Sequence, residues 1–248
     1  MNEKYLTDIK SHWEDPETES LKDKNLQVIE RSTIIEHLEK IKVSRLADFG
    51  CGNCEDTTHF SNYANLVDAF DYSGKMIKKA SNTINANEKN NISLFKLDLI
   101  NDQINNSYDT VITKRTLINL GNFENQKNTI VKICESLDND GHYLMLECSK
   151  DGLDNMNSMR KIFSLDDIPM PFHNSHFRLE DLIDFVEMYF EVISTRFFSD
   201  YFFLTRVVGP LLNKEQPYRY DNLFKELSSF QLINRQIGPQ FFLVLKKK

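Results

Sequence analysis

The chain has 248 residues, of which 40% are hydrophobic and 27% charged, and its net charge is −7. This length and composition suit a globular α/β domain with additions and a sizeable core. The negative charge leaves no basic surface for phosphate backbones, so DNA and RNA are disfavoured as partners. No run of about 18 apolar residues predicts a membrane span, and the polar first residues are unlike a secretory signal, so we expect a cytoplasmic protein.

The first predicted elements are a helix followed by a β-α-β unit. Apolar residues recur at helical spacing within residues 20–41, which predicts a helix ahead of the first strand. An apolar run over 43–49 enters the glycine turn Gly50-Cys51-Gly52, a helix is expected near 55–63, and a second apolar run over 66–70 ends in Asp71. Glycines let the backbone approach a ligand, and a carboxylate about 20 residues further on can hold a ribose diol.

This unit resembles the nucleoside-binding half of class I S-adenosylmethionine (SAM)-dependent methyltransferases. Asp48-Phe49-Gly50-Cys51-Gly52 is similar to the first motif of that family, and Asp71-Tyr72-Ser73-Gly74-Lys75-Met76 to the second. A dinucleotide-binding protein would carry a third glycine where this chain has Glu55, followed by Asp56. These carboxylates would repel a pyrophosphate, whereas the sulfonium and ammonium groups of SAM are cationic, so the pattern favours SAM over NAD. Cys54 stands where the family often has a further glycine, which narrows the space beside the methionine tail.

Two more strands place polar residues at the same edge of the sheet. After a helix near 73–86, the run 92–97 predicts a strand that ends at Asp98-Leu99, and 108–113 predicts another, followed by Lys114. Ligands of open α/β sheets lie beyond the carboxyl ends of the strands, so these groups should converge with Asp48 and Asp71. The alternative is that each aspartate caps a following helix or turn.

The resemblance implies a role for each of these residues. Asp71 would hold the ribose, Asp98 and the Leu99 amide the adenine, and Lys114 the methionine portion together with the glycine turn. Trp13 and Arg31 are candidates for a lid over the pocket, Arg31 meeting the methionine carboxylate, although a packing anchor and a solvated side chain are equally good readings. The cofactor-binding residues predicted in this way are Arg31, Asp48, Gly50, Cys51, Gly52, Asp71, Tyr72, Met76, Asp98, Leu99 and Lys114.

The cysteines support a competing hypothesis. Cys51 and Cys54 have the C-x-x-C spacing of dithiol redox centres and of half a zinc site. A zinc site needs about four ligands, and Cys134 and Cys148 fall singly on a predicted helix (122–137) and at the end of a predicted strand (142–147), so no metal site is predicted. A dithiol redox protein remains an alternative, but it would leave the three aspartates at the strand ends without a role.

The second half of the chain extends beyond the minimal fold. Residues 152–177 are expected to be a long connection from the fifth strand to a helix near 179–189, at an edge where such connections are often functional. The aromatic-rich run 190–208 predicts a long sixth strand, broken near Asp200, and 239–245 predicts the seventh. Between them we expect a helix over 221–229 and a tyrosine-rich loop.

Two histidines of the long connection are the predicted catalytic residues. Methyl transfer needs an acceptor atom held about 3 to 3.5 Å from the methyl carbon, and a hydroxyl acceptor also needs a general base. His173 and, after it, His176 are candidates, because Pro171, Phe172 and Asn174 can lower the pKa of His173 and fix its tautomer. A loop histidine bonded to the backbone is the alternative. His142 opens the fifth strand at the opposite end of the sheet and is a poor candidate.

Residues 140–248 also resemble a bacterial subgroup of these methyltransferases that is encoded with cell-surface sugar pathways. The residues that carry this resemblance are Glu147, Gly152, Leu153, Asn157, Arg160, Ile168, Pro171, His173, Asn174, Tyr201, Arg206 and the strand 241–246. Three arginines could bind an anionic acceptor: Arg160, Arg178 and Arg206. Three tyrosines could stack on a sugar: Tyr201, Tyr218 and Tyr220. The alternative is that the arginines are surface charges and the tyrosines are core aromatics.

The sequence therefore predicts one Rossmann-like α/β domain, with a seven-stranded, mostly parallel sheet and helices on both faces. Residues 1–42 would be an N-terminal helical cover, 43–148 the SAM-binding core, and 149–248 the acceptor region with a C-terminal lid insertion and the last strands. The predicted function is SAM-dependent O-methylation of a small polar acceptor, such as a sugar, a surface-glycan precursor or a phosphorylated metabolite. A dithiol redox protein and a non-catalytic SAM-binding protein are the alternatives.

Overall fold

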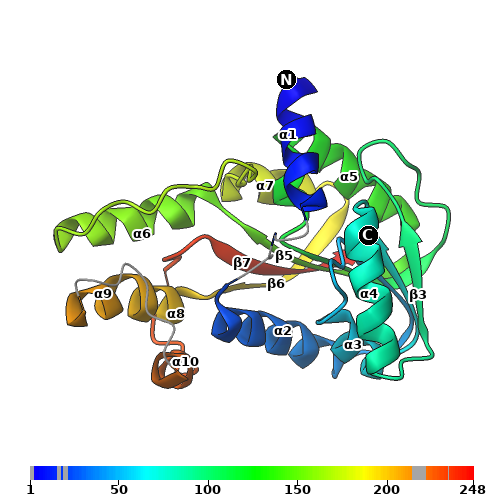
Figure 1. The fold of residues 1–248 in the computed structure, drawn as a ribbon, viewed down its shortest axis with the longest axis horizontal. Helices are drawn as coiled ribbons and strands as arrows, with labels where there is room; N and C mark the ends of the chain where they lie inside the picture. The colour runs from blue at the N-terminus through cyan, green and yellow to red at the C-terminus, as the bar shows by residue number, and fades with distance from the viewer. Residues whose placement is uncertain (1–2, 16–17, 19–21, 214–221, 234) are drawn as a thin grey trace.

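The computed structural model describes residues 3–15, 18, 22–213, 222–233 and 235–248, and within them seven strands form one sheet (Figure 1). The strand order is β3-β2-β1-β4-β5-β7-β6, in which β7 is antiparallel to both neighbours and the other pairs are parallel. This confirms the predicted fold class. The strands are β1 (Val43–Phe49), β2 (Ala64–Asp71), β3 (Ile92–Lys96), β4 (Tyr108–Lys114), β5 (Leu137–Cys148), β6 (Phe190–Phe197) and β7 (Gln240–Lys247).

Helices connect the strands and cover both faces of the sheet (Figure 1). Four of the α-helices in the described ranges begin at a polar residue whose side chain accepts a hydrogen bond from the first turn, as Asp23 does from Leu26 and Ser73 from Met76. The α-helices are α1 (Glu3–Glu14), α2 (Lys24–Leu38), α3 (Thr57–Phe60), α4 (Gly74–Ala86), α5 (Phe123–Ser136), α6 (Lys150–Ile162), α7 (Leu179–Val186), α8 (Ser199–Phe203), α9 (Gly209–Leu212) and α10 (Asn222–Ser228). Short 3₁₀ turns span Ser61–Tyr63 and Leu117–Asn119, and Leu204–Val208 is a π-helical turn.

The alternation of side chains along the strands divides the core into two layers. In β1, Ala47 and Phe49 belong to one apolar cluster, which α5 and α7 complete, while Leu46 belongs to the other, which α2, α6 and α8 complete. Both faces of the central strands are therefore buried, as in other parallel sheets. No helix in the described ranges is both long and apolar enough to cross a membrane.

Two predictions for the second half are wrong. The sixth strand does not run to residue 208, because β6 ends at Phe197 and the chain then continues as α8, the π-helical turn and α9. Tyr201, Thr205 and Gly209 are buried at the spacing of a helix, which overrides the strand preference of the aromatic residues. The connection predicted over 152–177 begins inside a helix, α6, whose N-cap Ser149 accepts a hydrogen bond from Gly152.

Candidate active site

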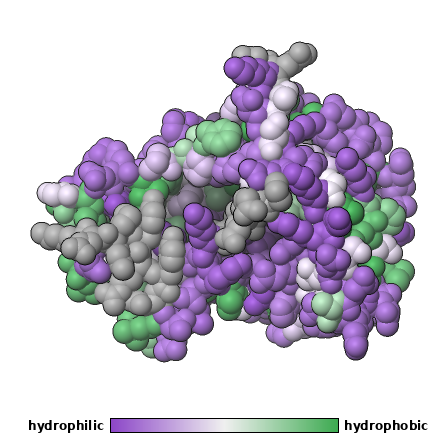
Figure 2. Space-filling view, viewed as in Figure 1, coloured by the Kyte–Doolittle hydropathy of each residue, from purple (hydrophilic) through white to green (hydrophobic). Residues whose placement is uncertain are grey.

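A cavity of about 680 Å³ lies beyond the carboxyl ends of the parallel strands, within the size range of small-molecule sites. Figure 2 shows a hollow in the middle of this face of the molecule. Apart from Arg31, every predicted site residue lines the cavity: Asp48, Gly50, Cys51, Gly52, Asp71, Tyr72, Met76, Asp98, Leu99, Lys114, His173 and His176. Residues up to 128 positions apart in the sequence, Asp48 and His176, thus meet around one space.

The glycine turn after β1 has the backbone conformation that its sequence suggests. Gly50 has φ +76° and Gly52 φ +56°, in the left-handed region that favours glycine. A Cβ atom at Gly50 would collide with the side chain of Thr116, whereas one at Gly52 would meet no atom within 4 Å. Gly50 is therefore required by packing, and Gly52 leaves open space at the wall of the cavity.

Asp71 closes the turn from the neighbouring strand. Its Oδ2 accepts a hydrogen bond from the Gly52 amide at 3.0 Å and its Oδ1 accepts one from the Ser73 amide at 2.9 Å. Burial raises the pKa of Asp71. A carboxylate offers about four lone-pair sites, so each oxygen can still accept a bond from a ligand hydroxyl.

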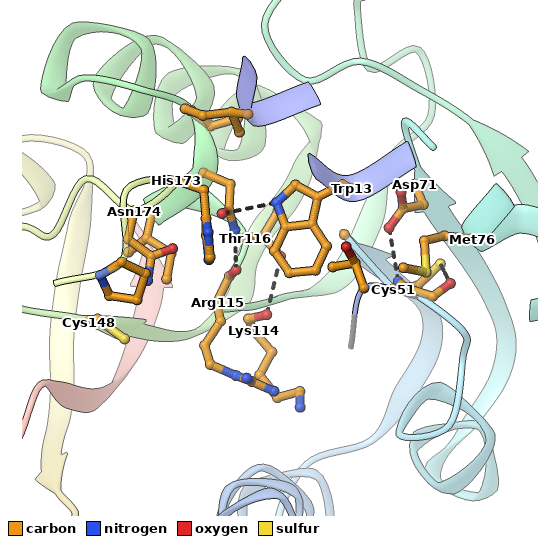
Figure 3. A pocket seen from close by; sticks show the side chains of 18 of the residues that line it. Trp13, Cys51, Asp71, Met76, Lys114, Arg115, Thr116, Cys148, His173 and Asn174 are labelled. Atoms are coloured by element: carbon orange, nitrogen blue, oxygen red, sulfur yellow. Dashed lines mark hydrogen bonds between the residues drawn. The ribbon is translucent and has the colours of Figure 1, made fainter. Parts of the chain in front are cut away.

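The residues after β2 and β3 contact the N-terminal helix. Asp98 Oδ2 accepts a hydrogen bond from Lys10 Nζ at 2.5 Å, and the Tyr72 hydroxyl donates to the Lys10 carbonyl at 2.9 Å. Lys10 and Trp13 both line the cavity, and the Trp13 Nε1 donates to Asn119 Oδ1 at 3.2 Å. In Figure 3 the Trp13 ring lies between His173 on one side and Asp71 and Met76 on the other. Helix α1 thus supplies part of the cavity wall, and a role of Trp13 as a lid over a ligand stays a prediction.

A network of ion pairs lies beneath the glycine turn. Lys114 Nζ is 2.5 Å from Asp56 Oδ2 and 3.5 Å from Glu30 Oε2, and Arg115 Nε is 3.3 Å from the same Glu30 oxygen. Arg31 pairs with Asp56 Oδ1 at 3.1 Å and is not part of the cavity wall, contrary to the prediction that it reaches the ligand. Lys114 and Arg115 are the members whose cationic side chains line the cavity (Figure 3).

Asp48, near the end of β1, supports the glycine turn from the buried side. Burial raises its pKa to about 6, and its Oδ2 accepts a hydrogen bond from the Thr57 hydroxyl at 2.5 Å. This bond joins the strand to the start of α3. Asp48 therefore holds the framework of the site as well as lining the cavity.

The cysteine pair has the properties of buried thiols. All four cysteines are free, and Cys54 is fully buried with φ +59°. A hydrogen bond with Cys54 and burial raise the pKa of the Cys51 thiol well above its ordinary value, the reverse of what a nucleophilic thiolate requires. No cluster of three or more metal-ligating side chains occurs in the part of the chain that the structure describes.

His173 and His176 line the opposite half of the cavity. The Nδ1 atom of each is buried and has no hydrogen-bond partner among the described residues. Burial lowers the pKa of each histidine to about 4, in the direction expected for His173 from its apolar neighbours. Both rings are thus uncharged near neutral pH and each leaves one polar atom unsatisfied.

Other predicted acceptor contacts are arranged differently. Arg206 lines the cavity, but its guanidinium donates to Asp23 Oδ2 at 2.9 Å, and the Tyr201 hydroxyl donates to Asp23 Oδ1 at 2.7 Å. The remaining candidates do not line the cavity or are not described: Tyr201 is fully buried, Arg160 Nε donates to the Asp166 carbonyl at 2.7 Å, Arg178 pairs with Asp151 at 3.3 Å, and Tyr218 and Tyr220 lie outside the described residues.

Glu147 contributes to the site without having been predicted to do so. Its buried carboxylate accepts hydrogen bonds from the amides of Thr116 (3.1 Å), Leu117 (3.0 Å) and Ile118 (3.4 Å), which form the turn after β4. Burial raises its pKa to about 7. A carboxylate directly after the apolar run 143–146 was a signal, because a buried acid needs several donors.

The fold and the cavity together define a Rossmann-like nucleoside-binding protein, with a glycine turn after β1 and an acidic residue after β2 and β3. A family model described as a methyltransferase domain matches residues 42–191, more than half of the chain. The chain therefore belongs to this methyltransferase family. No curated protein matches the sequence.

Solved structures of methyltransferases have the same fold at low sequence identity. N-methyltransferase NodS from Bradyrhizobium japonicum WM9, in complex with S-adenosyl-L-homocysteine (SAH), has a TM-score of 0.62 at 10% identity, covering 98% of each chain. Magnesium protoporphyrin IX methyltransferase (ChlM) from Synechocystis PCC 6803, with bound SAH, has a TM-score of 0.60 at 16% identity, covering 98% of this chain and 94% of that one. The PH0226 protein from Pyrococcus horikoshii OT3 has a TM-score of 0.62 at 11% identity, covering 92% and 93%. At these identities the likeness concerns the fold.

Proposed function

We propose that this methyltransferase acts on a hydroxyl oxygen of a small polar acceptor, such as a sugar or a surface-glycan precursor. The observation that carries the proposal is the pair of histidines His173 and His176, which line the cavity and whose buried Nδ1 atoms have no hydrogen-bond partner among the described residues. Each is a buried polar atom in need of a partner, and a ligand hydroxyl can supply one.

The cofactor half of the cavity fits SAM. Gly52 leaves room for close approach, Asp71 retains lone pairs for the ribose hydroxyls, and Lys114 and Arg115 bring positive charge for the methionine carboxylate. Asp98 and the Leu99 amide are proposed to bind the adenine, with Tyr72 and Met76 beside it. SAM supplies an electrophilic methyl group, and the chain itself binds, orients and excludes water.

The acceptor half favours oxygen over nitrogen as the methylated atom. A hydroxyl must lose its proton as the new O–C bond forms, and an uncharged imidazole can accept that proton. An amine acceptor would instead be recognised as an ammonium by a carboxylate. Asp23, the carboxylate on this side, is already bound by Arg206 and Tyr201. We therefore assign proton transfer to His173, with His176 orienting the acceptor.

The lining of this half also suits a small amphipathic molecule. Apolar side chains from α6 and the chain after it, including Leu153, Met156 and Ile168, alternate with the polar Asn174 and Gln240. A sugar ring offers both apolar faces and hydroxyls to such a wall.

The cofactor assignment is tested by calorimetry with SAH. Asp71→Ala removes two charge-assisted hydrogen bonds to the ribose, each worth about 1.5 to 3 kcal/mol, so we expect a loss of SAH affinity of roughly 100-fold or more. Asp184→Ala, which changes an exposed carboxylate on α7, is the matched control and should bind as the wild type does. Equal affinities of the two variants would contradict the assignment.

The acceptor assignment is tested by SAH release with a panel of monosaccharides and their amino-sugar counterparts. We expect hydroxyl methylation, and we expect His173→Ala to lower turnover by about 100-fold or more while SAH affinity stays unchanged. Transfer to the amino group in preference to the hydroxyls would refute the choice of oxygen. An equal loss of turnover and SAH affinity would argue against a role as base.

A further inference from the structure

His12 on α1 lies flat against His173. The two ring centroids are 4.3 Å apart and the ring planes differ by 16°. The edges of Trp13 and Phe172 close the same cluster, with centroids 5.1 Å and 5.4 Å from that of His12. His173 lines the cavity, and His12 packs against it without being part of the cavity wall.

Ring contacts set the orientation of His173. Its Nδ1 has no hydrogen-bond partner, so no bond at that atom fixes the imidazole plane. The backbone around it is held by the Asn174 amide, which donates to the Pro171 carbonyl at 3.0 Å. Trp13 meets the His173 ring edge-on at 5.5 Å, and His12 is the ring that stacks on it.

The position of His12 depends in turn on the nucleoside half of the site. Helix α1 is held there by the Lys10–Asp98 ion pair, by the Ser73 hydroxyl, which donates to the Trp13 carbonyl at 3.2 Å, and by the Gly74 amide, which donates to Glu14 Oε1 at 3.1 Å. On the acceptor side the Tyr5 hydroxyl donates to the Phe172 carbonyl at 2.8 Å. The same helix therefore contacts both halves of the cavity.

From these contacts we propose that His12 is a positioning residue for His173. It holds the imidazole plane at the cavity wall, and it does so while α1 is docked on the nucleoside half. This inference rests on the function proposed above. Because a second ring shields His173 from water, burial together with the facing His12 keeps the pKa of His173 near 4.

Nuclear magnetic resonance titration of His173 in the protein without ligand tests the proposal and needs no acceptor. In the wild type His173 should titrate near pH 4. His12→Ala opens one face of the ring to water, so we expect its pKa to rise by one unit or more toward 6.5. His12→Phe retains a stacked ring and should keep the value close to that of the wild type. His59→Ala, on the exposed side of α3, is the histidine control and should change nothing.

Two further measurements separate positioning from docking of the helix. Trp13 is the single tryptophan of the chain, so its fluorescence reports whether α1 stays in place. We expect His12→Ala to keep the SAH affinity and the wavelength of the Trp13 emission maximum of the wild type; only the emission intensity should change, because the His12 ring that contacts Trp13 at 5.1 Å is removed. Unchanged titration of His173 in His12→Ala, or a shifted Trp13 emission maximum with loss of SAH binding, would overturn the proposal.

Failure of this inference is distinguishable from failure of the proposed function. If His173→Ala keeps full turnover in the monosaccharide assay, the proposed base is wrong whatever His12 does. If turnover falls in His173→Ala but not in His12→Ala, the assignment of His173 as the base is supported and the positioning role of His12 is refuted. The double variant should be no slower than His173→Ala alone, because both changes act through one group.

Discussion

Glu147→Gln separates the charge of a buried residue from its size. The Glu147 carboxylate accepts three backbone amides of the turn after β4, and burial raises its pKa from 4.5 to about 7. Below pH 4.5 the group is protonated in both the folded and the unfolded chain. Between pH 4.5 and 7 the unfolded chain loses the proton and the folded chain keeps it, so the free energy of unfolding falls as pH rises through this window.

The size of the effect follows from the shift. A change of about 2.5 pKa units corresponds to about 3 kcal/mol, of which roughly 2.5 kcal/mol falls between pH 5 and pH 8.5. Glutamine cannot titrate. Between pH 5 and pH 8.5 the free energy of unfolding of Glu147→Gln should therefore fall by roughly 2.5 kcal/mol less than that of the wild type. Asp48, whose pKa burial also raises, is present in both proteins and cancels in the comparison.

Urea unfolding at pH 5 and pH 8.5 measures this difference. At pH 5 we expect Glu147→Gln to be the less stable protein, because its amide group places a donor against the backbone donors of the turn. At pH 8.5 the difference in the free energy of unfolding between the two proteins should be smaller or should change sign. Parallel pH dependences of the two proteins would show that Glu147 does not titrate as a buried acid, and would refute the reasoning.

Two further changes test the glycine turn. Gly50→Ala places a Cβ against Thr116 at φ +76°, so it should destabilise the fold by about 1 to 3 kcal/mol or more and weaken SAH binding. Thermal unfolding measures the loss of stability and calorimetry the loss of affinity. Wild-type stability and affinity would contradict the packing argument. Cys51→Ser should retain SAH binding and methyl transfer, because the raised pKa of the Cys51 thiol leaves it unreactive; loss of a thiol-dependent activity with intact SAH binding would instead favour the dithiol alternative.

The cofactor half of the site was predictable because its signals are local. The local signals lie within about 30 residues: an apolar run, a glycine turn and an acid at the end of the next strand. Parallel pairing of the strands brings Asp48, Asp71 and Asp98 to one edge of the sheet, independently of the rest of the chain. The family model confirms the class of protein that these motifs indicated.

The acceptor half was less predictable because its contacts are distant and its elements ambiguous. Aromatic residues suit strands and helices alike, and only the spacing of Tyr201, Thr205 and Gly209 shows that this segment is helical. The stacking of His12 on His173 joins residues 161 positions apart. This contact depends on where α1 packs against the rest of the protein. The periodicity of the side chains does not specify that position.

The antiparallel strand β7 determines when the sheet can be completed during synthesis. β6 pairs with β7 alone in the described sheet, and β7 lies between β5 and β6. Residues 190–197 leave the ribosome more than 40 residues before their partner, so β6 and one edge of β5 stay unpaired while β1 to β4 already have their partners. A chain truncated before Gln240 would therefore leave one edge of β5 and the whole of β6 unpaired, a hazard for aggregation that β7 removes by pairing with both strands.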